Sequence, residues 1–179
     1  GAYLPEDVSR KVRYLTRSLK VDLGFHAHNN LGMTIANSVA AVKAGAKIID
    51  ATSRGLGAGA GNCQLEVVVT VLLKMGYKLD LDLYQLMDNS EKIVAKIMEK
   101  PQEISSVSLT SGLAGVFSGF APHVKGAAER FGVDARDILI ELGRRKIVAG
   151  QEDIIIDVAA NLKQRGETGG EENPIEALI

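Results

Sequence analysis

The sequence has few of the residues that cross-link a chain or stack on a ligand. Its 179 residues include one cysteine, Cys63, and no tryptophan, and aromatic residues make up 4% of the chain. A single cysteine excludes an internal disulfide. The scarcity of aromatic side chains argues against a platform for carbohydrate or single-stranded nucleic acid. No apolar run reaches about 18 residues, and no basic, apolar signal segment is present, so we expect a cytoplasmic protein.

Neither sign of charge dominates the chain. Charged residues make up 24%, the formal net charge is -1, and 46% of the residues are hydrophobic. This balance excludes a disordered acidic or basic chain and gives no sign of nucleic-acid binding. The length suits one domain or one and a half, since domains commonly have about 100–200 residues. We therefore expect a globular protein with a sizeable core.

The first part of the chain alternates between helical and strand patterns. Pro5 suits a first helical turn, and Gly45 and Gly76 suit the ends of two later helices. We predict helices at 5–18, 31–43 and 64–75 and strands at 21–26 and 47–52. Strands that alternate with helices through short connections are typically parallel.

After Gly76 the alternation stops, and the pattern becomes helical throughout. We place a domain boundary here, with an α/β segment at 1–78, a helical domain at 79–163 and a disordered tail at 164–179. The helical domain should contain helices at 83–98, 135–145 and 151–163, with a further helix within the glycine-spaced segment 111–132. Asp134 should cap the helix that follows it. The tail is polar and rich in glycine, which is typical of disorder.

Two histidines, His26 and His28, stand at the end of the first predicted strand. Because side chains alternate along a strand, both imidazoles should point the same way and could bind one metal ion. Two ligands do not fill a coordination shell, so oxygen ligands must come from elsewhere. The simpler alternative is that both rings are partly buried and hydrogen-bonded to their neighbours.

A glycine-rich segment, RGLGAGAGN at 54–62, follows the second predicted strand and precedes a helix. Such a turn can hold an anion with its backbone N–H groups, or its glycines can serve only close packing. It also loosely matches a dinucleotide fingerprint, with Asp80 or Asp82 for a ribose, but that function leaves the histidines without a purpose. The segment and the histidines should lie at the same rim of a parallel sheet. In a TIM barrel this rim holds the active site, and two strands are too few to close a barrel.

Two stretches carry a resemblance to a known family. The sequences GFHAHNNLGMTIANSVAAVKAGAKIIDATSRGLGAGAGN (24–62) and ELGRRKIVAGQEDIIIDVA (141–159) closely resemble the C-terminal half of the 4-hydroxy-2-oxovalerate aldolases. These are pyruvate aldolases of the DRE-TIM metallolyase group. The resemblance extends to about Leu162, and within the group only 144–153 separates this aldolase from the related acyltransferases and lyases. It implies the last two strands of a TIM (β/α)8 barrel with their helices, followed by a small all-helical communication domain.

The resemblance also implies a metal site. His26 and His28 would bind a divalent cation, usually Mn²⁺, with an aspartate from the first strand of the barrel, which lies outside this chain. Asn62 would lie near the metal and the substrate. The reaction would be the cleavage of 4-hydroxy-2-oxopentanoate to pyruvate and acetaldehyde. In the family the catalytic base and arginine belong to the other half, so the resemblance assigns no catalytic residue to this chain, which should be inactive alone.

The communication domain in this family binds an acylating acetaldehyde dehydrogenase and passes the aldehyde to it. Where we expect tyrosines in the family segment, this chain has Leu113 and the substrate-binding candidate Phe117, which lacks a hydroxyl that could orient the 4-hydroxyl of the substrate. A non-catalytic docking module is the alternative that suits the isolated chain. Open strand edges should also promote self-association.

Overall fold

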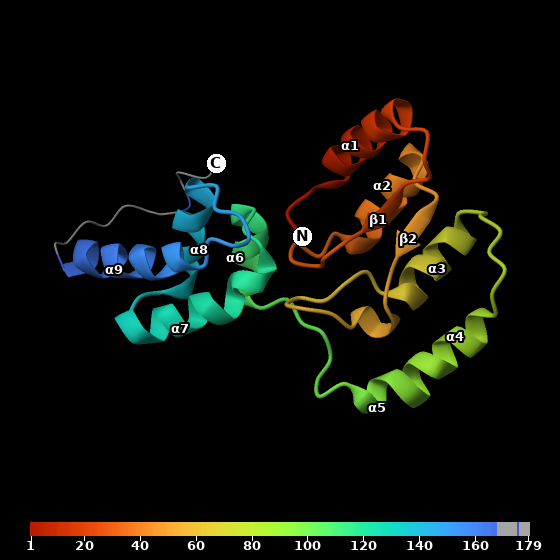
Figure 1. The fold of residues 1–179 in the computed structure, drawn as a ribbon. Helices are drawn as coiled ribbons and strands as arrows, with labels where there is room; N and C mark the ends of the chain where they lie inside the picture. The colour runs from red at the N-terminus through yellow and green to blue at the C-terminus, as the bar shows by residue number, and fades with distance from the viewer. Residues whose placement is uncertain (168–174, 176–179) are drawn as a thin grey trace. The chain divides into compact units, whose positions relative to one another are not determined.

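A computed structural model describes residues 1–167 and 175, and the contacts within it divide the chain into two compact units. The first unit consists of Gly1 and residues 3–103, and the second begins at Ile104. Figure 1 labels the helices and strands of both units. Among the described residues, no helix is both long and apolar enough to cross a membrane.

The first unit has the predicted alternation of helices and parallel strands. Its elements are α1 (Pro5–Ser18), β1 (Gly24–His26), α2 (Thr34–Ala44), β2 (Ile48–Asp50), η1 (Ser53–Gly55), α3 (Leu65–Lys74), α4 (Leu83–Asn89), the π-helical η2 (Ser90–Val94) and α5 (Ala95–Ile97). β1 and β2 are parallel, with Gly24 opposite Ile48 and His26 opposite Asp50. This confirms a partial barrel of two strands with their helices.

The helices cover one face of the strand pair. Figure 1 shows α1 beside α2, and the two pack through a cluster in which alanines allow a close approach. The members of this cluster are Val8, Val12, Ala40, Ala41, Ala44 and Ala46, with Leu23, Phe25 and Ile49 packed against it. A second cluster on α3 consists of Cys63, Val68 and Leu72. The other face of the strands, which carries Gly24, His26, Ile48 and Asp50, is exposed.

The predicted helix at 5–18 is confirmed, whereas the strands are shorter than predicted. β1 covers three residues of the predicted 21–26, and Val21 is exposed. A strand forms where a partner accepts its backbone hydrogen bonds, and β1 pairs only with β2 among the described residues. Hydropathy alone overestimates strand length for this reason.

The division between the units falls after Glu103, whereas the sequence places a boundary at 78/79. The segment α4–α5 stays with the first unit because α4 packs against α3, and η2 against η1. Ser90 of η2 is buried there. The predicted tail also differs in part, since residues 164–167 continue the last helix; apart from residue 175, the rest of that tail lies outside the described residues.

The second unit is all-helical, as predicted. It contains α6 (Ser106–Ala114), the 3₁₀ turn η3 (Ser118–Phe120), α7 (Ala121–Phe131), α8 (Ala135–Arg144) and α9 (Asp153–Glu167). The predicted cap is confirmed, because the Asp134 carboxylate accepts a hydrogen bond from the backbone N–H of Arg136. Gly143 allows α8 to approach α6 closely, since a Cβ there would clash with the carbonyl oxygen of Ala114.

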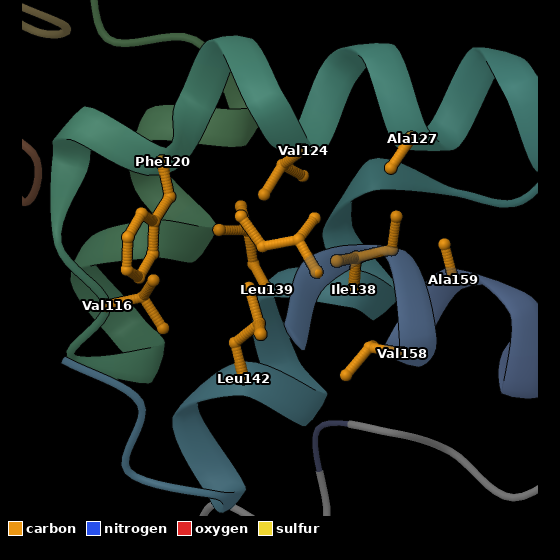
Figure 2. Close-up of a cluster of buried hydrophobic side chains, with 10 residues drawn as sticks. Val116, Phe120, Val124, Ala127, Ile138, Leu139, Leu142, Val158 and Ala159 are labelled. Atoms are coloured by element: carbon orange, nitrogen blue, oxygen red, sulfur yellow. The ribbon is translucent and has the colours of Figure 1, made fainter. Parts of the chain in front are cut away.

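One apolar core holds this unit together. Figure 2 shows side chains from α7, α8 and α9 directed toward one another, with Val116 beside Phe120. Phe120, Ile138, Leu139 and Leu142 are fully buried in it. Burying a large aliphatic or aromatic side chain contributes about 1.5–3 kcal/mol. Amphipathic helices of this length therefore depend on the shared core for their stability.

Replacing a core leucine should destabilise the second unit. We expect Leu139→Ala to lower its free energy of unfolding by about 3 kcal/mol, because the vacated volume is enclosed on all sides. Leu113→Ala on the exposed side of α6 is the control and should cost less than about 1 kcal/mol. Urea unfolding followed by circular dichroism measures both, and equal losses would contradict this core assignment.

The first unit should promote self-association of the 179-residue chain. β1 and β2 pair only with each other within the described residues, and Val21 and Ile48 are exposed by 67% and 58%. Open strand edges with apolar side chains recruit further strands. Light scattering should show a mass that rises with concentration, and Ile48→Lys should shift it toward the monomer. A monomeric mass at every concentration would refute this expectation.

Candidate metal centre

His26 and His28 lie on the exposed face of the strand pair, and their rings point toward each other. Their Nε2 atoms are 3.3 Å apart, and the ring centroids are 4.8 Å apart with the rings edge to face. The strand alternation therefore predicted their common direction correctly. Metal–imidazole bonds measure about 2.0–2.1 Å, so two nitrogen ligands of one ion lie about 2.8–3.0 Å apart at an octahedral angle and about 3.3–3.4 Å apart at a tetrahedral angle. The observed separation fits a shared ion, and it equally fits a hydrogen bond between the two rings, which is the alternative left open by the sequence.

Asp50 orients the first of these rings. Its Oδ2 lies 3.0 Å from Nδ1 of His26, and the two residues are directly opposite each other in the β1–β2 register. When Nδ1–H donates to this carboxylate, the lone pair of His26 is on Nε2, the atom that faces His28. Sequence reasoning missed Asp50, although an aspartate at the end of the next parallel strand, at the position that pairs with a histidine, was a usable signal.

His28 is in an environment that favours the neutral ring. Burial lowers its pKa, the nearby positive charge of His26 lowers it further, and the backbone of Gly61 opposes these effects only in part. Its Nδ1 is buried and has no hydrogen-bond partner. A neutral imidazole is the form that binds metal.

The glycine-rich segment turns back so that Asn62 lies beside His28. Asn62 and His28 form an isolated antiparallel bridge, flanked by hydrogen bonds from Asn29 N to Gly61 O (2.8 Å) and from Cys63 N to Ala27 O (3.1 Å). Opposite residues in an antiparallel bridge share a face, so Asn62 joins the two histidines. A Cβ at position 57 would lie 2.5 Å from Nδ2 of Asn62, so a side chain there would displace the Asn62 amide.

The amide oxygen of Asn62 has no partner within the described chain. Its Nδ2 donates to Leu56 O at 3.3 Å, while its Oδ1 is buried and has no hydrogen-bond partner. An unpaired buried oxygen is costly unless something binds it. A hard divalent cation accepts both imidazole nitrogens and amide oxygens, so these three side chains fit such an ion.

The donor set within this chain is incomplete. In residues 1–167 and 175, no three His, Cys, Asp or Glu side chains are grouped so that they could hold a metal ion.

The remaining candidate, Phe117, belongs to the helical unit. It is 54% exposed, and its ring packs edge to face against Phe120 with centroids 5.7 Å apart.

The geometry disfavours the dinucleotide alternative. Three backbone N–H groups of the loop donate to nearby carbonyl oxygens, Gly55 N to Thr52 O, Gly61 N to Ala58 O and Asn62 N to Gly55 O. They are therefore not directed at a pyrophosphate. Asp82 caps α4 by accepting a hydrogen bond from Gln85 N at 3.0 Å.

Comparisons with known proteins agree with this architecture. Residues 1–93 match the family model described as HMGL-like, and residues 102–164 match the DmpG-like communication domain. The chain is 56% identical over 162 residues to a 4-hydroxy-2-oxovalerate aldolase of Bacillus thuringiensis (strain Al Hakam), covering 90% of this chain and 48% of that protein. It is 53% identical over 170 residues to that of Geobacillus thermodenitrificans (strain NG80-2), covering 95% and 50%. The chain thus spans about half the length of these relatives.

A solved structure shows the same fold at low identity. The carboxyl transferase domain of Rhizobium etli pyruvate carboxylase, determined with 3-hydroxypyruvate, matches with a TM-score of 0.69 and 19% identity. The match covers 93% of this chain and 30% of that one. A partial barrel followed by a communication domain, together with the matching family models, shows that the chain belongs to the HMGL-like family.

Proposed function

We propose that this chain is part of a divalent-metal-dependent aldolase that cleaves 4-hydroxy-2-oxopentanoate to pyruvate and acetaldehyde. The observation that carries the proposal is the 3.3 Å separation of the two Nε2 atoms of His26 and His28. The names of the relatives supply the substrate class. The unpaired Oδ1 of Asn62 beside His28 supports the same site.

In this proposal His26 and His28 hold the cation, and Asn62 lies next to it. A bound divalent cation supplies Lewis acidity that polarises the 2-keto oxygen of the substrate. Asp50 keeps the His26 ring in the tautomer and orientation that binding requires, and the glycine-rich loop keeps Asn62 opposite His28. We expect Mn²⁺ to be the physiological ion.

The rest of the machinery would come from outside this chain. We propose that the third metal ligand, an aspartate, belongs to the remaining barrel strands, together with the catalytic base and an arginine. No three acidic, His or Cys side chains that could hold a metal are grouped among residues 1–167 and 175, which supports this division. The 179-residue chain alone should therefore have no aldolase activity.

The helical unit would bind a partner enzyme. We propose an acylating acetaldehyde dehydrogenase that receives the volatile aldehyde directly. The match of residues 102–164 to a communication domain supports this assignment. A chain that only docks, without catalysis, is the second candidate, and the incomplete ligand set favours it for the isolated chain.

Removing either imidazole should abolish tight metal binding. In a protein that contains the whole barrel, we expect His26→Ala and His28→Ala each to weaken Mn²⁺ binding by at least about 100-fold and to abolish cleavage, because each removes a direct ligand. Calorimetry with Mn²⁺ and a pyruvate-release assay measure the two effects. His123→Ala, on the exposed side of α7, is the matched control and should bind normally. Native binding in both site variants would refute the assignment.

Restoring a hydroxyl at position 117 should change selectivity. We expect Phe117→Tyr to alter the ratio of kcat/KM for the two 4-hydroxy enantiomers by about 2–10-fold, the effect of one added hydrogen bond. Phe131→Tyr adds the same group at the end of α7 and should leave the ratio unchanged. The proposal for Phe117 would fail if both variants gave the ratio of the unaltered enzyme.

A further inference from the structure

We propose that Glu66 is a positioning residue for the candidate metal centre, because its carboxylate fixes the start of the loop that brings Asn62 to His28. This inference rests on the proposed function of that centre. Glu66 lies in the first turn of α3, outside the ligand set. It would therefore act through the loop and not on the metal or the substrate.

The carboxylate of Glu66 binds two consecutive residues at the start of the loop. The hydroxyl of Ser53 donates a short hydrogen bond to Oε1. The backbone N–H of Arg54 donates to both oxygens, at 3.1 Å to Oε2 and 3.3 Å to Oε1. These bonds are charge-assisted, which makes them stronger than bonds between neutral groups.

The backbone at Arg54 needs such support. Its φ of 55° is in the left-handed region, which is unfavourable for residues that have a Cβ. Only two residues other than glycine adopt a positive φ within the described part of the chain, and Arg54 is the one in the loop that leads to Asn62. The bifurcated bond to Glu66 holds its N–H in this conformation, so loss of the carboxylate should release it.

The geometry at Arg54 is passed directly to Asn62. The next residue, Gly55, accepts a hydrogen bond from Asn62 N at 2.8 Å, and a Cβ on Gly55 would lie 3.0 Å from Asn62 O. The first and last parts of the loop are therefore in close contact. A change at Arg54 would displace Asn62, and with it the bridge to His28.

A third interaction links Glu66 to the segment η2. The side chain of Ser90, buried in the π-helical segment η2, also acts on the carboxylate and lowers its pKa. Burial raises the pKa of Glu66, but the hydrogen bonds from Ser53 and the backbone, together with Ser90, bring it below its usual value. The carboxylate is thus ionised at neutral pH, the form that accepts all these bonds.

Glu66→Gln tests the role, since it keeps the shape of the side chain and removes its charge. The protein with the complete barrel is used, and two quantities are measured. Hydrogen exchange without metal reports on the amides of 54–62, and electron paramagnetic resonance titration gives the Kd for Mn²⁺. Ser53→Ala removes one donor and leaves Glu66 intact. Glu91→Gln is the matched control, because Glu91 is exposed and lines a pocket to which Arg54 and Glu66 also contribute.

We expect Glu66→Gln to speed exchange in 54–62 and to raise the Kd about tenfold, the usual effect of losing a group that supports metal ligands. Ser53→Ala should act in the same direction but less strongly, and Glu91→Gln should change neither quantity. Unchanged loop exchange, unchanged Kd, or faster exchange spread evenly over the first unit would each overturn the positioning role. If the unaltered protein bound no Mn²⁺, the proposed function itself would fail. If the unaltered protein and Glu66→Gln bound Mn²⁺ equally well, only the positioning role would fail.

Discussion

The backbone pairing of His28 with Asn62 determines where the polar groups of the candidate metal centre lie. It follows directly on β1, so the strand that positions His26 also positions the return of the glycine-rich loop. Because β1 is parallel to β2, the same register places Asp50 beside His26. The strand β1, the His28–Asn62 bridge and the β1–β2 register thus place four side chains on one face. They are His26, His28, Asp50 and Asn62. None of these three backbone features requires a long or flexible side chain.

The two faces of the strand pair have different physical roles. One face is covered by α1, α2 and α3 through alanine-rich and aliphatic contacts, which provide the rigidity that a metal site needs. The opposite face is exposed and carries the polar groups together with Ile48. In a complete barrel this second face is the interior. The polar groups of the candidate metal centre and the exposed Ile48 therefore lie on the same face for the same reason. The helical unit has its own core and is held together separately.

The sequence predicted the features that depend on local patterns. The helix at 5–18, the cap at Asp134, and the common direction of His26 and His28 follow from periodicity and capping alone. The features that the sequence did not predict depend on contacts between distant segments. The strand lengths are set by pairing partners, the segment α4–α5 joins the first unit through contacts with α3 and η1, and Asp50 reaches His26 only through the register. Glu66 was missed because a glutamate in a first helical turn is ordinary until the left-handed Arg54 is seen beside it.

The central claim is that one cation is shared by the imidazoles of His26 and His28. Electron spin echo spectroscopy of Mn²⁺ bound to the complete protein, with histidine labelled by ¹⁵N, counts the imidazole nitrogens on the ion directly. The account predicts two coordinated histidine nitrogens, which fall to one when either residue is replaced. Manganese that carries no histidine nitrogen, or whose signal is unchanged in both variants, would contradict it.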